Sequence, residues 1–90
     1  EVIYQFPGIK EAAVVSQLDP RKGEAPVAFV SLDDGVAFDE KALSHFIRGK
    51  LADYKVPRRI ELLPALPRNA TGKILKTTLR DIAKQHRVDG

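Results

Sequence analysis

The 90-residue sequence contains no cysteine, so it can form neither a disulfide bond nor a thiolate metal site. Its two histidines, His45 and His86, are too far apart in the sequence to indicate a chelating pair. The lack of cysteine suits a reducing compartment, and we expect a cytoplasmic protein. The N-terminal residues EVIYQFPG lack the basic start and apolar centre of a signal peptide. No apolar run approaches the roughly 20 residues that cross a bilayer, so we expect no membrane span.

Positive charge is scarce in the first half of the chain and abundant in the second. Residues 1–45 carry four Lys or Arg against eight Asp or Glu, whereas residues 46–90 carry eleven against four. A basic surface attracts the phosphates of nucleotides or nucleic acids, although lysines on a solvated helix are more often plain soluble surface. The charge alone therefore leaves nucleotide binding, nucleic-acid binding and a solvated surface open.

A chain of this length forms one small domain with a single compact core. Two β-rich runs, residues 12–18 and 27–32, are joined by the turn formers of DPRKGEAP and predict an antiparallel pair. In the second run both alternating sets of residues are largely apolar. This pattern favours a strand that is covered on both faces.

Three helices and a third strand are expected around this pair. The opening EVIYQF predicts the last turns of a helix, which the following Pro-Gly pair ends. Asp39 can cap a helix that runs to Leu51, residues 59–63 alternate as a short strand, and a last amphipathic helix begins near Leu75. The order predicts a two-layer α+β domain with a three-stranded mixed sheet, including a right-handed parallel crossover.

The segment PRNATGKILK, residues 67–76, carries the strongest chemical signal. It is not a Walker loop, because Pro67 and Ile74 stand where that loop needs a glycine and a Ser or Thr. Prolines and Gly72 shape the backbone, so we expect a shaped projection and not a slack tether. Lys73 offers a compact positive charge that can stabilise negative charge on a phosphate or carboxylate. The plain alternative is a lysine that only extends into solvent from the entrance of a helix.

Three segments, in order along the chain, resemble the adenylate-forming acyl-CoA synthetases. The segment LPRNATGKILKTTLR is similar to the C-terminal signature of that family, and LADYKVPRRIELLPALPRNATGKI is similar to its run into the lysine loop. The opening EVIYQFPGIKEAAVVSQLDPRKGEAPVAFVSL resembles its succession of a helix, an aromatic-proline pair, an acidic-Ala-Ala-Val-Val strand and a Gly-Glu-x-Pro-x-Ala-Phe-Val strand. The resemblance covers essentially all of residues 1–90 and implies the small, mobile C-terminal domain of such an enzyme.

The resemblance also implies a reaction in two steps. A large N-terminal domain, expected with its hinge upstream of Glu1, would bind ATP, Mg²⁺ and a small carboxylic acid and form an acyl-adenylate. The small domain would then rotate and present another face while coenzyme A attacks. The 90-residue domain alone is therefore expected to be inactive, and the acid cannot be identified because its pocket belongs to the large domain.

Site residues follow from the same resemblance. Lys73 matches the family lysine of the first step, and Gly72 matches the glycine beside it. Arg48 lies where the acetyl-CoA synthetase branch has an arginine near coenzyme A, although a solvated helix arginine is an equal alternative. Lys55 and Arg58 are weaker candidates for contacts with coenzyme A. A glycine in KGEAP, residue 23, is assigned to a turn and not to a ligand.

Other functions remain open from the sequence. A peptide-synthetase adenylation domain would transfer its acyl group to a carrier protein, and a luciferase would oxidise the adenylate, although NATGKILKTTLR is more similar to the acid-CoA ligases. A basic nucleic-acid-binding module would present exposed aromatic residues. Phe29, Phe46 and Tyr4 instead lie on core-facing patterns, and Tyr54 stands alone. We therefore expect no nucleic-acid partner.

Overall fold

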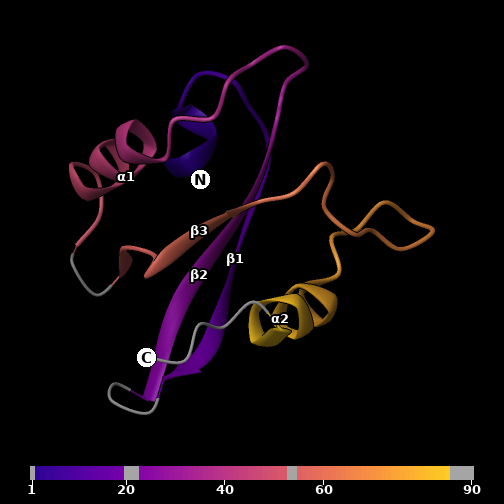
Figure 1. Cartoon of the computed structure of the whole chain (residues 1–90). Coiled ribbons are helices and arrows are strands. Elements are labelled where there is room, and N and C mark those ends of the chain that lie inside the picture. Colours follow the sequence, from indigo (N-terminus) through magenta and orange to yellow (C-terminus); the bar gives the residue numbers. More distant parts are fainter. Residues whose placement is uncertain (1, 20–22, 53–54, 86–90) are drawn as a thin grey trace.

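A computed structural model describes residues 2–19, 23–52 and 55–85. These residues form a three-stranded sheet that is flanked by helices (Figure 1). The elements are η1 (Val2–Gln5), β1 (Ile9–Asp19), β2 (Gly23–Leu32), α1 (Glu40–Arg48), β3 (Arg59–Leu62) and α2 (Lys76–Gln85). The α+β class and the order of the elements are the predicted ones.

The sheet is mixed, with β2 as its central strand. β1 pairs with β2 in antiparallel fashion, for example with Val15 opposite Val27, and the pairing extends over more residues than the sequence pattern marks. β3 pairs with the other edge of β2 in parallel, with Ala28 opposite Ile60. The predicted antiparallel pair and parallel strand, helix, strand unit are therefore confirmed.

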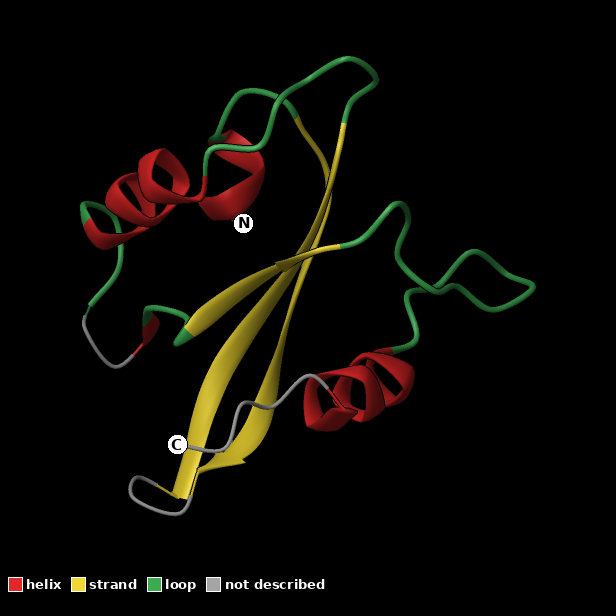
Figure 2. Cartoon of the chain, in the orientation of Figure 1, coloured by secondary structure: helices red, strands yellow, loops and turns green. Residues whose placement is uncertain are grey.

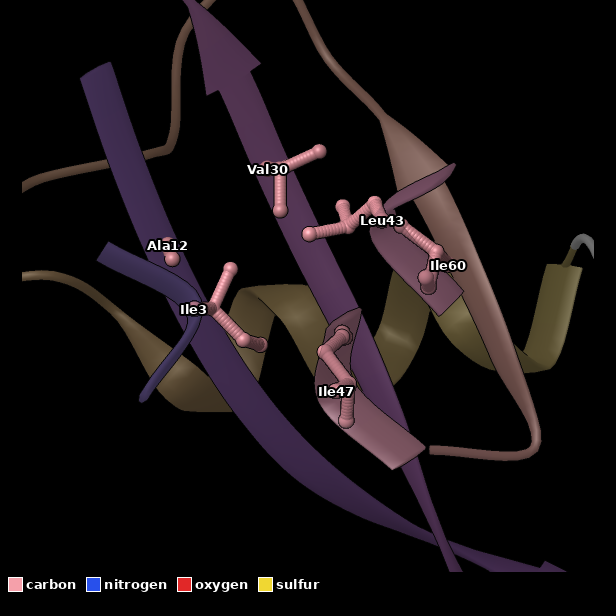
Figure 3. Packing of buried hydrophobic residues seen from close by; sticks show 7 residues of the cluster. Ile3, Ala12, Val30, Leu43, Ile47 and Ile60 are labelled. Atoms are coloured by element: carbon pink, nitrogen blue, oxygen red, sulfur yellow. The ribbon is translucent and has the colours of Figure 1, made fainter. Parts of the chain in front are cut away.

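The central strand β2 is buried on both faces, as its sequence predicts. Ala28 and Val30 face a cluster that η1 and α1 complete (Figure 3). Val27 and Phe29 face a second cluster that α2 completes. The first cluster contains Ile3, Ala12, Ala28, Val30, Leu43, Ile47 and Ile60, and the second contains Ala13, Val15, Val27, Phe29, Leu66, Leu79 and Ala83.

The helices consequently lie on opposite faces of the sheet, η1 and α1 on one and α2 on the other (Figure 2). The arrangement has three layers, which corrects the layer count of the predicted α+β domain. The reason is physical: a strand that is apolar on both faces leaves apolar surface exposed unless each face receives its own cover.

The N-terminal turn differs in detail from its prediction. η1 is a single 3₁₀ turn, in which successive side chains are about 120° apart. Ile3 is therefore buried while Tyr4 is 44% exposed, which corrects the core-facing position expected for Tyr4. Phe46 is half-buried on α1, with its ring centroid 5.4 Å from that of Phe6. Tyr54 lies outside the described residues.

The helix α1 begins where the sequence predicts and ends earlier. Asp39 has extended backbone angles, and its carboxylate accepts a hydrogen bond from the amide of Ala42 at 3.0 Å, which caps the helix. The helix ends at Arg48, followed by Gly49 as its C-cap, a residue with low helix propensity, and does not run to Leu51 as expected. Leu51 still packs half-buried against the cluster on this face.

We expect the Asp39 cap to contribute measurably to stability. The Asp39→Ala change should lower the free energy of unfolding by about 1 kcal/mol, because the Ala42 amide loses its acceptor. For a domain of this size the melting temperature should fall by roughly 4–8 °C, as measured by circular dichroism. Asp39→Ser, which keeps an acceptor, should retain most of the stability. Equal melting temperatures for Asp39→Ala and the wild type would contradict the capping role.

Candidate functional site

The segment between β3 and α2 is a small hairpin that projects from the α2 side of the sheet (Figure 1). Arg68 and Ile74 form an antiparallel bridge, and the Leu75 amide donates to the carbonyl of Pro67 at 2.9 Å. Leu66, just before the hairpin, is only 4% exposed and packs in the cluster below α2. The segment is therefore a shaped projection, as predicted.

The tip of the hairpin is held by the side chain of Asn69. Its Oδ1 accepts hydrogen bonds from the Thr71 amide at 3.0 Å, the Thr71 hydroxyl at 2.7 Å and the Lys73 amide at 3.0 Å. Gly72 has a φ of +87°, a conformation that residues with a Cβ rarely adopt. A Cβ at Gly72 would meet nothing within 4 Å, so the requirement for glycine here comes from the backbone angle.

Lys73 combines a fixed backbone with an exposed side chain. Its amide donates to Oδ1 of Asn69, and its carbonyl accepts from the Asn69 amide at 2.9 Å. The ammonium has no hydrogen-bond or ion-pair partner within the described part of the chain. An exposed cation on a fixed backbone can meet an incoming anion without first breaking an internal ion pair.

The base of the hairpin is anchored to the sheet by Glu11, which is 9% exposed. Its Oε1 accepts from the Ser31 hydroxyl at 2.7 Å and from the Leu66 amide at 3.2 Å. Its Oε2 accepts a hydrogen bond from Nε of Arg68 at 2.9 Å and forms an ion pair with Nη2 of the same side chain at 2.8 Å. Nη1 of Arg68 donates to the carbonyl of Gly72 at 2.6 Å. A continuous chain of polar contacts therefore runs from the sheet to the residue before Lys73.

A β-bulge places Glu11 on the correct face. Ile9 pairs with Leu32 and Glu11 pairs with Ser31, so Lys10 is an extra residue in β1. Without it Ile9 and Glu11 would lie on the same face, because side chains alternate along a strand. With it Ile9 packs against the cluster on the α1 side, while Glu11 reaches Ser31 and the hairpin on the α2 side.

The surroundings of Glu11 lower the pKa of its carboxyl group. The hydrogen bond from the Ser31 hydroxyl contributes most to the lowering, and burial acts in the opposite direction. The Leu66 amide and the Arg68 guanidinium lower the pKa further. The group is therefore ionised at neutral pH, which a charge-assisted contact with Arg68 requires.

The helix that follows the hairpin is fixed at its C-terminal end. Nη2 of Arg59 and Nε2 of Gln17 both donate to the carbonyl of Ala83, at 2.6 and 3.1 Å. A cation near the last turn of a helix is favourable because unpaired carbonyls collect there. Arg59 is itself paired with Glu61 at 2.9 Å. The hairpin is thus bounded by a sheet contact at one end and a docked helix at the other.

The residues expected near coenzyme A lie on the other side of the sheet. Arg48 is exposed on α1 and shares a small polar hollow of about 130 Å³ with Arg58 and Ser44. Lys55 lines a separate and more apolar hollow of about 450 Å³, beside Leu51. Arg48 and Arg58 therefore line one hollow and Lys55 lines another, and Pro57 lines both. Both hollows are lined in part by the cluster on the α1 side, with Ile3 in the larger and Ile47 in the smaller, whereas the hairpin of Lys73 lies on the α2 side.

Gly23 has a φ of +82° at the start of β2, which agrees with a turn role. Among residues 2–19, 23–52 and 55–85, no three His, Cys, Asp or Glu side chains are grouped in a way that could hold a metal ion. Within the same residues, no helix has the length and apolar character needed to cross a membrane.

Four residues that support the hairpin were not predicted from the sequence: Glu11, Ser31, Arg68 and Asn69. Glu11 appears only as the acidic residue before the Ala-Ala-Val-Val strand, and Arg68 and Asn69 only as part of PRNATGK. The one available signal is an acidic residue directly before the apolar run Ala-Ala-Val-Val, since a carboxylate that becomes buried needs partners.

Known proteins are similar to this chain in sequence and in fold. The family model described as the AMP-binding enzyme C-terminal domain matches residues 1–73. The 2-succinylbenzoate–CoA ligase of Bacillus cereus is 41% identical over 94% of this chain, which spans 17% of that enzyme. ATP-bound MatB from Rhodopseudomonas palustris superposes with a TM-score of 0.87 at 35% identity, over 92% of this chain and 16% of MatB.

A third comparison concerns an enzyme with a different product. The amide bond synthetase McbA from Marinactinospora thermotolerans superposes with a TM-score of 0.84 at 37% identity, over 90% of this chain and 16% of McbA. In each of these comparisons the chain spans about one sixth of the known protein. From the family match and these similarities, the chain belongs to the family of AMP-binding enzyme C-terminal domains.

Proposed function

We propose that residues 1–90 are the mobile C-terminal domain of an AMP-forming acid–CoA ligase, whose large N-terminal domain binds the acid and ATP. The observation that carries the proposal is the hairpin of Lys73, where a fixed backbone presents an ammonium that has no partner among the described residues. Family membership and the small share of each relative that the chain spans support a larger parent enzyme. The lack of cysteine supports a cytoplasmic location for this enzyme.

Lys73 is the proposed catalytic residue of the first step. An oxygen of the carboxylate attacks the α-phosphorus of ATP, and the bond to pyrophosphate breaks. Two anions must approach each other, so a cation between them lowers the barrier. The Lys73 ammonium suits this role because its backbone is already positioned by Asn69 and Gly72.

ATP and Mg²⁺ are proposed co-substrate and cofactor of the parent enzyme. The likeness to ATP-bound MatB supports ATP, and the exposed Lys73 ammonium suits its phosphate oxygens. Mg²⁺ prefers several oxygen ligands, often from carboxylates, and the described residues group no three acidic or histidine side chains. We therefore assign the Mg²⁺ ligands to the large domain.

The second step is proposed to use the α1 side of the domain. The thiol of coenzyme A attacks the acyl carbon, and AMP leaves. Arg48 and Arg58 line one polar hollow, and paired guanidinium groups suit the phosphates of coenzyme A. Lys55 is proposed as a separate contact, since its hollow is mostly apolar. The two sides of the sheet would thus serve the two steps.

A second candidate acceptor of the acyl group is favoured by one observation, the likeness to the amide bond synthetase McbA. In that case an amine, and not a thiol, would attack the adenylate. The first step and the role of Lys73 would be unchanged, whereas Arg48 would lose its function. A nucleic-acid partner remains unexpected: within the described residues Tyr4 is the one exposed aromatic side chain, and base stacking needs a platform of them.

Lys73→Ala in the full-length enzyme should reduce adenylate formation about 100-fold to 1000-fold, as expected for one preorganised charged group. Thioester formation from a synthetic acyl-adenylate should remain, because this loop then lies away from the reacting carbonyl. The measurements are pyrophosphate exchange, with acetate, octanoate and benzoate as probe acids, and single-turnover thioester formation. Lys76→Ala removes another exposed lysine three residues later and should change neither rate. Equal losses of both steps in Lys73→Ala would rule out the first-step role.

Arg48→Ala should raise the apparent KM for coenzyme A about tenfold or more and leave that for ATP nearly unchanged, because one charge-assisted contact to a phosphate is lost. Steady-state kinetics with varied coenzyme A measure the effect. Arg80→Ala removes an exposed arginine from α2, on the opposite side of the sheet, and serves as the matched control. Unaltered kinetics for coenzyme A in Arg48→Ala would assign Arg48 to the solvated surface.

A further inference from the structure

The Glu11 carboxylate is the link between the sheet and the hairpin that carries Lys73. We propose that Glu11 is a positioning residue for Lys73: through Arg68 it fixes the hairpin in the pose that adenylate formation needs. The inference rests on the proposed function, because it assumes that Lys73 acts in the first step. It assigns a role to a residue that does not itself reach the substrate.

The contacts around Arg68 carry the proposal. Its guanidinium is planar, so fixing two nitrogens also fixes the direction of the third. Nε and Nη2 are held by Oε2 of Glu11, and Nη1 then meets the carbonyl of Gly72. That carbonyl belongs to the peptide group that precedes Lys73. The position of the Lys73 backbone is thus tied to a carboxylate on β1.

The anchor is firm at its sheet end. The Glu11 side chain is 11% exposed, whereas that of Arg68 is 41% exposed. Glu11 is also held by the hydroxyl of Ser31, a fully buried residue on the central strand. The exposed member of the pair is therefore positioned by the buried one. The bulge at Lys10 supports a positioning role for Glu11, because bulges commonly redirect a side chain beside a functional site.

The substitution Glu11→Gln tests the link selectively. A glutamine keeps the shape of the side chain but offers one oxygen and one NH₂ group in place of two oxygens. If the oxygen stays toward Ser31 and the Leu66 amide, the NH₂ group faces two N–H donors of Arg68. If the amide is flipped, the Leu66 amide loses its acceptor. Leu66 and Arg68 both belong to the segment between β3 and α2, so either orientation removes a contact that holds the hairpin.

The experiment uses the full-length enzyme and two readouts. Pyrophosphate exchange with the same probe acids should fall about tenfold or more in Glu11→Gln, while thioester formation from synthetic adenylate stays near the wild-type rate. Hydrogen exchange measured by mass spectrometry should be about tenfold faster in peptides of residues 67–75 and unchanged in peptides of β2. A general loss of stability would instead slow both half-reactions and raise hydrogen exchange in β2 as well as in residues 67–75.

Glu61→Gln is the matched control. Glu61 pairs with Arg59 at 2.9 Å on the same sheet. Arg59 in turn donates to the carbonyl of Ala83 on α2, whereas Arg68 donates to a carbonyl in the hairpin. The Glu61→Gln change should alter the rates of adenylate and thioester formation by the same factor and leave hydrogen exchange in residues 67–75 unchanged. Arg68→Gln cuts the same link from its exposed end and should reproduce the Glu11→Gln pattern. It replaces Glu11→Gln if that variant does not fold.

The outcomes separate the inference from the function on which it rests. Unchanged hydrogen exchange in residues 67–75, or equal losses of both half-reactions, would overturn the role of Glu11. If the wild-type enzyme shows no pyrophosphate exchange with any probe acid, and Lys73→Ala has the same pyrophosphate-exchange rate as the wild type, the proposed function fails for these acids. The hydrogen-exchange comparison still decides whether Glu11 holds the hairpin.

Discussion

The double-sided apolar character of β2 is the constraint on which the domain depends. Because Ala28 and Val30 alternate with Val27 and Phe29, each face of the sheet requires its own helical cover. The chain meets this requirement by placing α1 between β2 and β3 on one side and α2 after β3 on the other. The hollow of Arg48 and the hairpin of Lys73 therefore lie on opposite sides as a consequence of packing.

The Glu11 contacts show how a small sheet controls a loop that extends beyond it. A buried carboxylate is costly unless its oxygens are satisfied, and here Ser31, Leu66 and Arg68 satisfy them. The same partners lower the pKa of the carboxyl group, so it remains charged at neutral pH. The charge that makes the residue costly to bury is also what orients Arg68.

The features that could be predicted from sequence are those encoded within a few residues. Strand alternation, the Asp39 cap and the turn chemistry of the Lys73 hairpin are local patterns, and the structure confirms them as elements. The contact between Glu11 and Arg68 spans 57 positions, and the bulge at Lys10 follows from a register that only the paired strands define. Tertiary constraints of this kind leave no periodic trace in a single sequence.

The stiffness of the hairpin has a consequence for motion in the proposed enzyme. Lys73 is tied by Asn69 at the tip and, through Gly72 and Arg68, to the sheet at the base. Moving Lys73 relative to the sheet would break several of these bonds at once, whereas moving the whole domain breaks none of them. A rigid body with different proposed site residues on its two sides can exchange them at one active site by rotation. If Lys73 acts as proposed, the internal contacts favour domain rotation, and not loop opening, as the means by which it would enter and leave the active site.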